Sequence, residues 1–500
     1  MASECVLAID LGTGGPKVAL VSADGATVAW SSRPVATRFI DGGGAEQDPE
    51  EMWTAIVAAT RATIDAAPRP TPPIVAVAVT SQYMSTVPVA ANGMPTGPCV
   101  IWMDTRGADH NLSLLTDETF ALFVERHGLL PLPSGNDNVA HIHVLRTLHP
   151  EAYAAAAAFL EPMDYVNARL TGTLGATQST AFGQMVCDNR TWGLTEYDAE
   201  LVAATHLDPD KLAPLMPMNG IVGSVTTAAA SELGIAEGLP VTTGTIDSIT
   251  SAIGCGALTD HDASIIIGTT SVVGAHIDEH RGDLAAGIFV MPSPLPGKYC
   301  VMAENGVGGR ALEWAMRLFG YGHDYEAATS SALDVVAGAE GVEFMPWLLG
   351  SIAPQPNDEV RAAFTGLSLH HDRRHMVRAV MEGVAVNLGW LLPTVESFVR
   401  HDFASVGFGG GGAQSDLWAQ LLADAVGRPV HQMEDPRATN ARGAAFLAFS
   451  ILGTLSIDDV PSLLRTRAIR QPDPGNRVGM ERALHRLTDL HRALANLTNY

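Results

Sequence analysis

The sequence has few cysteines and few basic residues. Among its 500 residues there are 5 cysteines, scattered without CxxC pairs, so a disulfide scaffold is excluded and we expect reduced thiols in a cytoplasmic protein. Lys and Arg number 30 against 54 Asp and Glu, a formal net charge of −24. Nucleic acid and anionic membranes bind clustered cations, so we expect neither as a partner.

Long apolar runs and common nucleotide motifs are also missing. The chain passes from Met1 directly into a strand-like segment at Cys5 to Asp10, without the basic start of a signal peptide. No apolar run approaches the roughly 20 residues that span a bilayer. Neither GxxxxGK[ST] nor GxGxxG with a downstream acidic residue is present, which argues against a P-loop and against an NAD-dependent dehydrogenase.

One local pattern occurs twice, about half the chain apart. Val6 to Val21 reads as two strands joined by a glycine turn, and Ala263 to His276 repeats the arrangement. A repeated device of this kind predicts a duplicated, two-lobed architecture. With 47% hydrophobic and 17% charged residues, the composition fits two or three ordinary globular domains.

Strand and helix signals alternate between these points, which predicts α/β layers. Asp48 is a plausible N-cap for a helix over 49–66. The remaining clear signals predict strands at 74–79, 99–102 and 405–408 and helices at 375–398 and 417–426. We place the lobe boundary near 255–262, which gives lobes of residues 1–255 and 256–454 and a peripheral helical tail over 455–500.

The first glycine turn is a candidate phosphate site. Asp10 ends the first strand and is followed by Gly12 to Gly15, whose small residues let backbone N–H groups approach phosphate oxygens. Thr13 adds a hydroxyl, and Asp10 can hold hydrated Mg²⁺. A tight hairpin whose glycines only permit positive φ would give the same pattern.

Three further segments could carry chemistry, each with a structural alternative. Gly268-Thr269-Thr270 offers a second hydroxyl-bearing turn, or is a threonine-rich strand end. Gly409 to Gly412 permits close backbone approach to a ligand, or is a flexible loop. Asp247 could accept the proton of an alcohol during phosphoryl transfer, or could be a helix N-cap.

The order of these motifs resembles the FGGY family of carbohydrate kinases over roughly residues 5–450. DLGTGGPK (Asp10 to Lys17) resembles the family's first phosphate loop, DxGTxxxK/R, and WMDTR (Trp102 to Arg106) resembles its sugar-contacting WxDxR. GTIDSITSAIGCG (Gly244 to Gly256) resembles the segment around the catalytic aspartate. Further similar segments are EQDPEEMW at 46–53, GTT at 268–270, ENGVGGRALEWAM at 304–316, RAAFTGLSLHHDRRHMVRAVMEGVAVNL at 361–388 and GFGGGGAQSDLWAQLLADAVGRPV at 407–430.

The resemblance implies a two-lobed actin-like ATPase (ribonuclease H-like) fold, with ATP and Mg²⁺ in a cleft between the lobes. It implies that Asp247 is the general base and that Asp10 orients Mg²⁺. The implied nucleotide contacts are Thr13, Lys17, Gly268, Thr269, Gly411, Gly412 and Ser415. The implied sugar contacts are Gln82, Met84, Asp104 and Asp247.

The expected activity is ATP-dependent phosphorylation of a hydroxyl on a small sugar or polyol, with D-xylulose the nearest named substrate. Xylulose kinases usually carry QMHG where this chain has Gln82-Tyr83-Met84-Ser85, so Met84 stands where a histidine is expected. The Arg-Glu pair of glycerol kinases is absent too. Another ketose, an alditol or a sugar acid stays open, as does a non-catalytic ATP-binding regulator of the same fold. A homodimer is common in the family.

Overall fold

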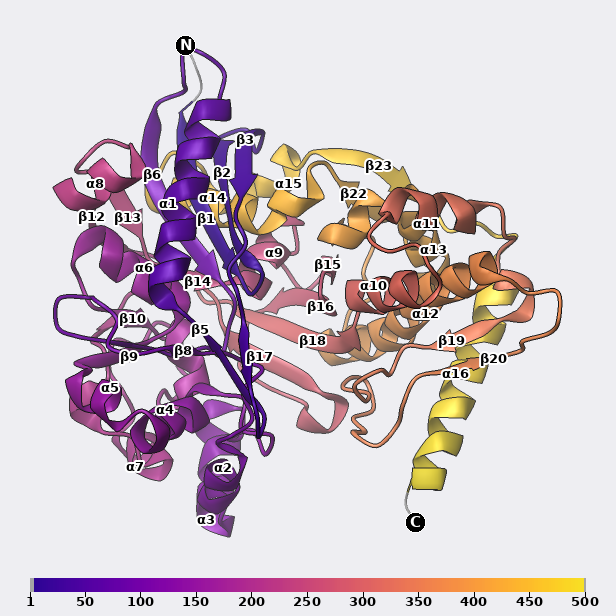
Figure 1. The fold of residues 1–500 in the computed structure, drawn as a ribbon, viewed down its shortest axis with the longest axis horizontal. Coiled ribbons are helices and arrows are strands. Elements are labelled where there is room, and N and C mark those ends of the chain that lie inside the picture. The colour runs from indigo at the N-terminus through magenta and orange to yellow at the C-terminus, as the bar shows by residue number, and fades with distance from the viewer. Residues whose placement is uncertain (1–3, 499–500) are drawn as a thin grey trace.

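The computed structural model describes residues 4–498, which form two lobes side by side (Figure 1). Each lobe is built on a mixed sheet of seven strands covered by helices. No helix within residues 4–498 combines the length and the apolar character that crossing a membrane requires. The five cysteines are buried, and none forms a disulfide bond within residues 4–498.

The first lobe's sheet has the order β12-β13-β6-β1-β2-β3, with β14 beside β6. Its strands are β1 (Cys5–Gly12), β2 (Gly15–Ser22), β3 (Thr27–Ser32), β6 (Ile74–Ser81), β12 (Ile221–Ser224), β13 (Pro240–Thr242) and β14 (Thr245–Ile246). The hairpin β1-β2 is antiparallel, whereas β1 and β6 run parallel. The predicted first hairpin is confirmed.

The second lobe's sheet repeats this plan in the order β17-β18-β16-β15-β21-β22-β23. Its strands are β15 (Ala263–Ile267), β16 (Thr270–Ile277), β17 (Ile288–Pro292), β18 (Tyr299–Val307), β21 (Val406–Gly409), β22 (Val430–Met433) and β23 (Thr466–Arg470). The hairpin β15-β16 is antiparallel and β15 runs parallel to β21. The two-lobed α/β prediction is therefore confirmed.

The helices with clear sequence signals form close to where they are predicted. α1 (Pro49–Ala66) begins after Asp48, whose carboxylate accepts the N–H of Glu50 at 2.9 Å. α12 (Arg373–Val399) and α13 (Asp416–Val426) cover the 375–398 and 417–426 predictions. The other longer helices are α4 (Asn138–Leu148), α6 (Pro162–Thr171), α10 (Gly309–Leu318), α11 (Tyr325–Leu333) and α16 (Arg477–Thr498).

Short elements complete the lobes. The first lobe adds β4 (Arg38–Ile40), β5 (Gly44–Gln47), β7 (Val87–Val89), β8 (Cys99–Val100), β9 (Ala158–Leu160), β10 (Ala176–Thr177), β11 (Leu215–Met216), α2 (Ala108–Leu114), α3 (Asp117–Leu122), α5 (Pro150–Ala155), α7 (Ala199–Thr205) and α8 (Thr227–Leu233). The second half adds β19 (Glu343–Met345), β20 (Ala363–Thr365) and α15 (Val460–Leu463).

Two helices join the lobes. α9 (Asp247–Gly254) leaves the first sheet, and α14 (Thr439–Ile451) returns from the second lobe and packs on β1, β2 and β6. The helices cross closely: a Cβ on Gly443 would lie 1.8 Å from the Thr250 oxygen, and one on Gly254 would lie 2.2 Å from the Thr439 oxygen. Glycine is required at both positions because any side chain would push the helices apart.

The predicted division at 454/455 stays a prediction, but packing contacts cross it. α14 lies before it but contributes Ala444, Ala445 and Ala448 to a core cluster with the first sheet. Beyond it, β23 pairs with β22 and α16 packs against α12 and α13. The segment after 455 is thus not only a helical appendage, because it supplies the edge strand of the second sheet.

Candidate active site

The end of β1 carries a buried carboxylate and a lysine partner. Asp10 is 1% exposed and stands opposite Lys17 in the hairpin register. Lys17 Nζ lies 3.1 Å from Asp10 Oδ2, and attraction to Asp10 raises the pKa of Lys17. Asp10 Oδ1 is buried without a hydrogen-bond partner among residues 4–498. Such an atom is costly to bury unless a ligand satisfies it, and hydrated Mg²⁺ binds oxygen atoms of this kind.

Thr13 belongs to a network of polar side chains below the glycine turn. Its hydroxyl donates to Gln82 Oε1 at 2.7 Å and accepts from Trp102 Nε1 at 2.9 Å. Gln82 Nε2 donates to Gln47 Oε1 at 2.8 Å, and Gln47 Nε2 donates to the Thr13 carbonyl oxygen at 2.7 Å. The network fixes the turn. Gln47 and Trp102 lay in motifs noted in the sequence, but no signal gave them this role.

Asp104 is held inside the first lobe. It is fully buried, and its Oδ2 accepts from the Ala45 N–H at 2.8 Å and from the Arg106 guanidinium. Arg106 Nη2 also contacts Glu46 Oε1 at 2.8 Å. In this arrangement Asp104 anchors Arg106 and the backbone of β5, which orders the segment that carries Trp102.

Asp247 begins helix α9 directly after β14. The N-cap is Ile246, so the N-cap interpretation of Asp247 does not hold. Ser248 Oγ lies 3.3 Å from the carboxylate. Burial, together with the negative charge of Asp10, raises the pKa of Asp247 to about 7, against the opposing charge of Lys17. A carboxyl group with a pKa near neutrality is suited to proton transfer.

The second lobe brings another carboxyl group toward Asp247. Glu304 lies on β18, and burial and the Asp247 charge raise its pKa to about 7, while a hydrogen bond from Thr270 opposes the rise. Sequence reasoning missed Glu304 because it lies inside a longer family-like segment without a signal of its own. Charged groups of both lobes are therefore close enough to interact across the junction.

The turn at Gly268 and Thr269 connects β15 to β16. The Gly268 N–H donates to the Thr270 oxygen at 2.9 Å, and the Gly309 N–H donates to the Gly268 oxygen at 2.7 Å. A Cβ on Gly309 would lie 2.5 Å from that oxygen, so α10 starts directly against the turn. The threonine-rich turn is thus fixed by the first backbone N–H groups of α10, which donate to its carbonyl oxygens.

The glycine run after β21 contains glycines with different environments. A Cβ on Gly412 would lie 2.8 Å from the Ile267 Cβ, so Gly412 is needed for packing. A Cβ on Gly411 has no atom nearer than the Ile267 oxygen at 4.0 Å and would point into open space. Ser415 is the N-cap of α13 and accepts the Trp418 N–H at 3.2 Å. The run is ordered by these contacts, so the flexible-loop interpretation does not hold.

Met84 sits in a strained turn that follows Gln82. Its φ of 50° is unusual for a residue with a side chain. Glu161 Oε2 accepts the Ser85 N–H at 3.1 Å and holds the turn, while burial raises the pKa of Glu161 well above its usual range. The Tyr83 hydroxyl is buried without a partner among the described residues. A strained turn with unsatisfied polar atoms is typical of a binding site.

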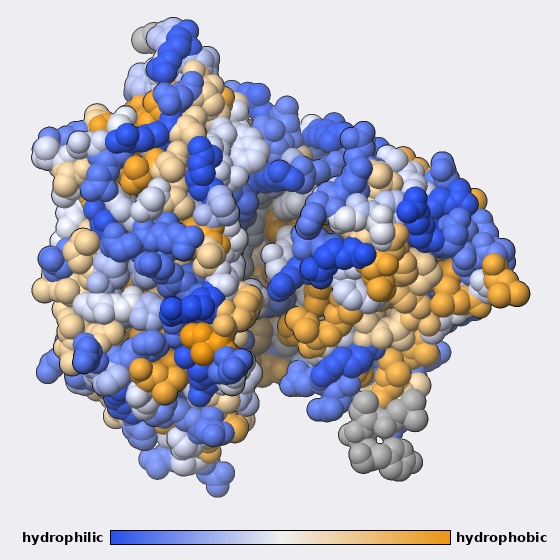
Figure 2. All heavy atoms as spheres, in the orientation of Figure 1, coloured by the Kyte–Doolittle hydropathy of each residue, from blue (hydrophilic) through white to orange (hydrophobic). Residues whose placement is uncertain are grey.

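The surface is hollowed between the two lobes (Figure 2). Asp10 and Asp247 raise the pKa of Lys17, and the charge of Asp247 helps raise the pKa of Glu304 in the second lobe. Gln82 and Asp104 are instead engaged in networks within the first lobe. The charged groups therefore gather where the lobes meet, and the polar networks support them from one side.

Comparison with known proteins gives matches over nearly the whole chain. A xylulose kinase of Staphylococcus epidermidis is 27% identical over 454 residues, covering 91% of this chain and 89% of the relative. A gluconokinase of Bacillus licheniformis is 25% identical, covering 98% of this chain and 96% of the relative. The solved structure of a xylulose kinase from Rhodospirillum rubrum has a TM-score of 0.83 at 26% identity, covering 99% of this chain and 100% of that chain.

Family models agree with these relatives on both lobes. The N-terminal domain of the FGGY family of carbohydrate kinases matches residues 5–254, and its C-terminal domain matches residues 263–451. The two matches meet at the lobe junction that carries Asp247. The chain belongs to the FGGY family of carbohydrate kinases and is a sugar kinase.

Proposed function

We propose that this kinase transfers the γ-phosphoryl group of ATP to a hydroxyl of a neutral sugar or polyol, with Asp247 as the general base. The observation that carries the proposal is the pKa of Asp247, raised to about 7 at the junction of the lobes. A base with this pKa is half ionised at neutral pH and can accept the proton of an alcohol as the alcohol attacks phosphorus.

The reaction follows from these roles. The substrate oxygen forms a bond to the γ-phosphorus, its proton passes to Asp247, and the bond between the γ-phosphorus and the β–γ bridging oxygen breaks to release ADP. Lys17 and the turn at Thr13 face the negative charge of the transferring group. Mg²⁺, when bound, neutralises phosphate charge, and the unpartnered oxygen of Asp10 supports its placement there.

Turns of both lobes supply the contacts to the nucleotide. The Thr269 hydroxyl can approach a phosphate oxygen, while the first N–H groups of α10 donate to the Gly268 and Thr269 oxygens and hold the turn in position. The open space over Gly411 supports a place for the nucleoside, with Gly412 and Ser415 holding the run in position. Closure of the lobes around both ligands would exclude water from the transfer.

A neutral substrate fits the charges around the Met84 turn. The ionisable groups that act on Tyr83 are the acids Glu161 and Asp137, and Arg106 is already paired with Asp104 and Glu46. A sugar acid would therefore meet no free cation from these groups. We take D-xylulose as the first candidate, since xylulose kinases are among the similar proteins. An alditol or another ketose is the next.

A substrate panel tests the proposal. ADP release is measured by a coupled assay with D-xylulose, other ketoses, alditols and gluconate, using wild type and Asp247→Asn. We expect turnover with a neutral substrate that the variant loses. Turnover restricted to gluconate would contradict the neutral-substrate assignment, and unchanged turnover in the variant would contradict the role of Asp247.

A further inference from the structure

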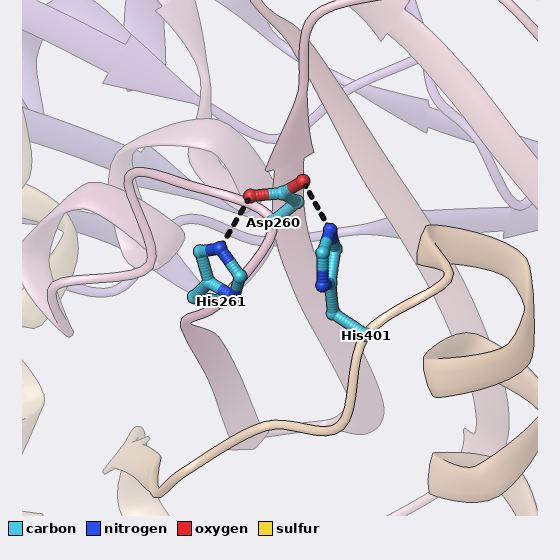
Figure 3. Close-up of side chains that lie close together, drawn as sticks. All are labelled: Asp260, His261 and His401. Atoms are coloured by element: carbon cyan, nitrogen blue, oxygen red, sulfur yellow. Dashed lines mark ion pairs between the residues drawn. The ribbon is translucent and has the colours of Figure 1, made fainter.

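Asp260, His261 and His401 gather where the linker between the lobes meets the end of α12 (Figure 3). Asp260 and His261 lie in the turn between α9 and β15, and His401 directly follows Arg400, the C-cap residue of α12. One ligand atom of each side chain lies within 4.8 Å of the other two. We call these three residues the Asp260 cluster. No step of the proposed phosphoryl transfer uses them.

The Asp260 carboxylate faces one imidazole at each oxygen. His401 Nε2 lies 3.1 Å from Asp260 Oδ2, and His261 Nε2 lies 3.7 Å from Asp260 Oδ1. These two distances lie on either side of the roughly 3.3–3.4 Å expected between ligands placed tetrahedrally about 2.0–2.1 Å from one ion. The longer contact exceeds the range of a hydrogen bond. The spacing therefore suits an ion shared by the carboxylate and both rings.

The ring protons of His261 and His401 are free to reside on Nδ1. Within residues 4–498, no N–H group donates to Nδ1 of either ring. The side chains of His261 and His401 are 65% and 41% exposed, so water can accept from Nδ1–H. Each Nε2 then keeps its lone pair and faces Asp260. A neutral imidazole in this state is the form that binds a metal ion.

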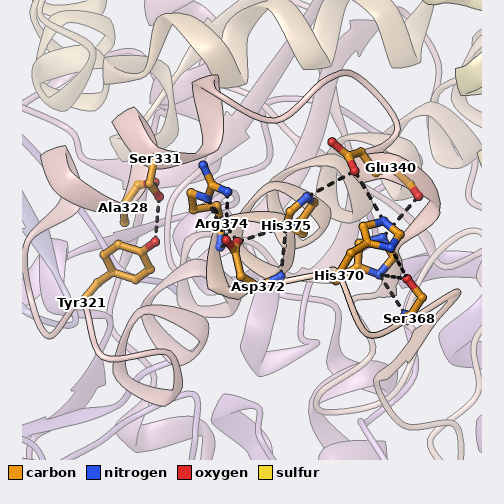
Figure 4. Close-up of polar contacts among 10 residues, drawn as sticks. Tyr321, Ala328, Ser331, Glu340, Ser368, His370, Asp372, Arg374 and His375 are labelled. Carbon is orange, nitrogen blue, oxygen red and sulfur yellow. Dashed lines mark hydrogen bonds and ion pairs between the residues drawn. The ribbon is translucent and has the colours of Figure 1, made fainter.

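A second group of histidines in the same lobe differs on this point (Figure 4). Ligand atoms of Glu340, His370 and His371 also lie within 4.8 Å of one another. There the Ser368 N–H donates to Nδ1 of His371 at 2.9 Å, and His371 Nε2 lies 3.4 Å from the Glu340 carbonyl oxygen. His371 therefore carries its proton on Nε2 and has no free nitrogen lone pair for a metal. This group provides a control.

The charges around the Asp260 cluster favour a cation. His401 follows the C-terminus of α12, a helix of 27 residues whose last carbonyl oxygens carry partial negative charge. Among residues 4–498, Asp260 has no Lys or Arg partner, and its ion pairs are those with the two histidines. Arg400 pairs instead with Glu279 at 3.6 Å. No basic side chain thus occupies the carboxylate that would hold the ion.

Hydrogen bonds order both segments that carry the cluster. The Thr259 hydroxyl donates to Asp262 Oδ2 at 2.8 Å and accepts the His261 N–H at 3.2 Å. On the other segment, the His401 N–H donates to the Glu396 oxygen at 3.2 Å. The backbone of both histidines is therefore in place before an ion binds, which lowers the entropy cost of binding.

We propose that the Asp260 cluster binds a divalent transition-metal ion such as Zn²⁺ through Nε2 of both histidines and the Asp260 carboxylate. Imidazole nitrogens with one carboxylate favour zinc and its neighbours over magnesium, which prefers oxygen ligands. Three protein ligands leave a position for water. The ion joins the turn before β15 to the end of α12. This site is separate from the proposed Mg²⁺ position at Asp10 and does not depend on the proposed function.

Zinc titration of tag-free, chelator-treated full-length enzyme tests the proposal. Zn²⁺ affinity is measured by competition with a chromophoric chelator, in excess Mg²⁺, for wild type, Asp260→Asn, His261→Ala, His401→Ala and the control His371→Ala. We expect one zinc ion per chain in wild type and control. Each of the three ligand variants should bind it at least about tenfold more weakly, since even outer partners of metal ligands contribute about 10- to 100-fold.

Thermal unfolding of the same five proteins gives a second readout. In chelator their Tm values should be alike, because the altered side chains are partly exposed. Zinc should then raise the Tm of wild type and control more than that of the ligand variants, because an ion that binds the folded chain stabilises it. The proposal is overturned if wild type binds no zinc, if the ligand variants bind it as wild type does, or if His371→Ala alone loses it.

Discussion

Replacing Asp247 by Asn tests the base directly, because the amide matches the carboxylate in size but cannot take the proton. General bases contribute typically about 10²–10⁴-fold to turnover. We expect kcat to fall by at least about 100-fold while the KM values for ATP and sugar change little. For wild type, kcat/KM should fall about tenfold per pH unit on the acid side of the Asp247 pKa, since only the ionised form accepts a proton.

The free energy of unfolding should fall as the pH rises, whereas kcat/KM rises with pH. The pKa of Asp247 is raised from 3.8 to about 7, so between these values the folded chain holds a proton that the unfolded chain has lost. Stability therefore falls as the pH rises through this window and levels off above it. About three pH units correspond to about 4 kcal/mol at most. Solvent in the cleft screens the charge, so we expect about 1–2 kcal/mol.

Asp247→Asn has no carboxyl group to ionise in the folded chain. Its Tm should therefore exceed that of wild type by a few degrees at pH 8 and by less at pH 5. Glu304→Gln is the matched control, because its carboxyl group has a similarly raised pKa close by. We expect it to keep most of the turnover and the acid limb of the pH profile. If Asp247→Asn retains more than about a tenth of kcat, or if Glu304→Gln alone removes the acid limb, Asp247 is not the base.

Three further substitutions test other parts of the site. Gly411→Val should raise the KM for ATP at least about tenfold and leave Tm unchanged, because a Cβ at this position points into open space. The control Gly412→Val should lower Tm, because a Cβ there would meet Ile267. Equal rises in the KM for ATP and for sugar would refute a nucleotide contact at Gly411. Met84→His should improve kcat/KM for xylulose roughly 10- to 150-fold by restoring a hydrogen-bonding partner, and a loss of activity on xylulose would refute the pocket argument. Gly443→Ala places a Cβ 1.8 Å from a backbone oxygen of α9 and should lower both Tm and kcat. The control Gly479→Ala, whose Cβ would have no atom within 4 Å, should lower neither. Unchanged Tm and kcat in Gly443→Ala would show that the helix crossing is loosely packed.

Local signals predicted the parts of the fold that local interactions determine. The hairpin at 6–21 and the helix over 49–66 follow from glycine turns, strand periodicity and the Asp48 cap, all within a few residues. The placement of α14 on the first sheet and of β23 on the second could not be predicted in this way. The partners of α14 lie near the start of the chain, and β23 pairs Arg470 with Val430 on the far side of α14; no local periodicity reports either contact.

In the candidate site, too, residues in local motifs could be predicted, whereas contacts between distant residues could not. Asp10 lies near the end of β1 and Asp247 begins α9 directly after β14, both within recognisable segments, so their places in the fold could be predicted. The hydrogen bonds that engage Gln82 join residues 35 and 69 positions apart, and the contact of Thr13 with Trp102 spans 89. The sequence shows that such polar residues exist but not whether they face a ligand or one another.

The charges at the lobe junction connect nucleotide binding with base strength. Asp10 contributes to the raised pKa of Asp247, and Lys17 acts against it. A cation held by the free oxygen of Asp10 would cancel part of the Asp10 charge and so lower the pKa of Asp247. Asp247 then ionises more readily when the nucleotide complex is in place. Without the nucleotide complex, the buried carboxyl group is protonated in about half of the molecules at neutral pH, which limits the cost of burying a charge there.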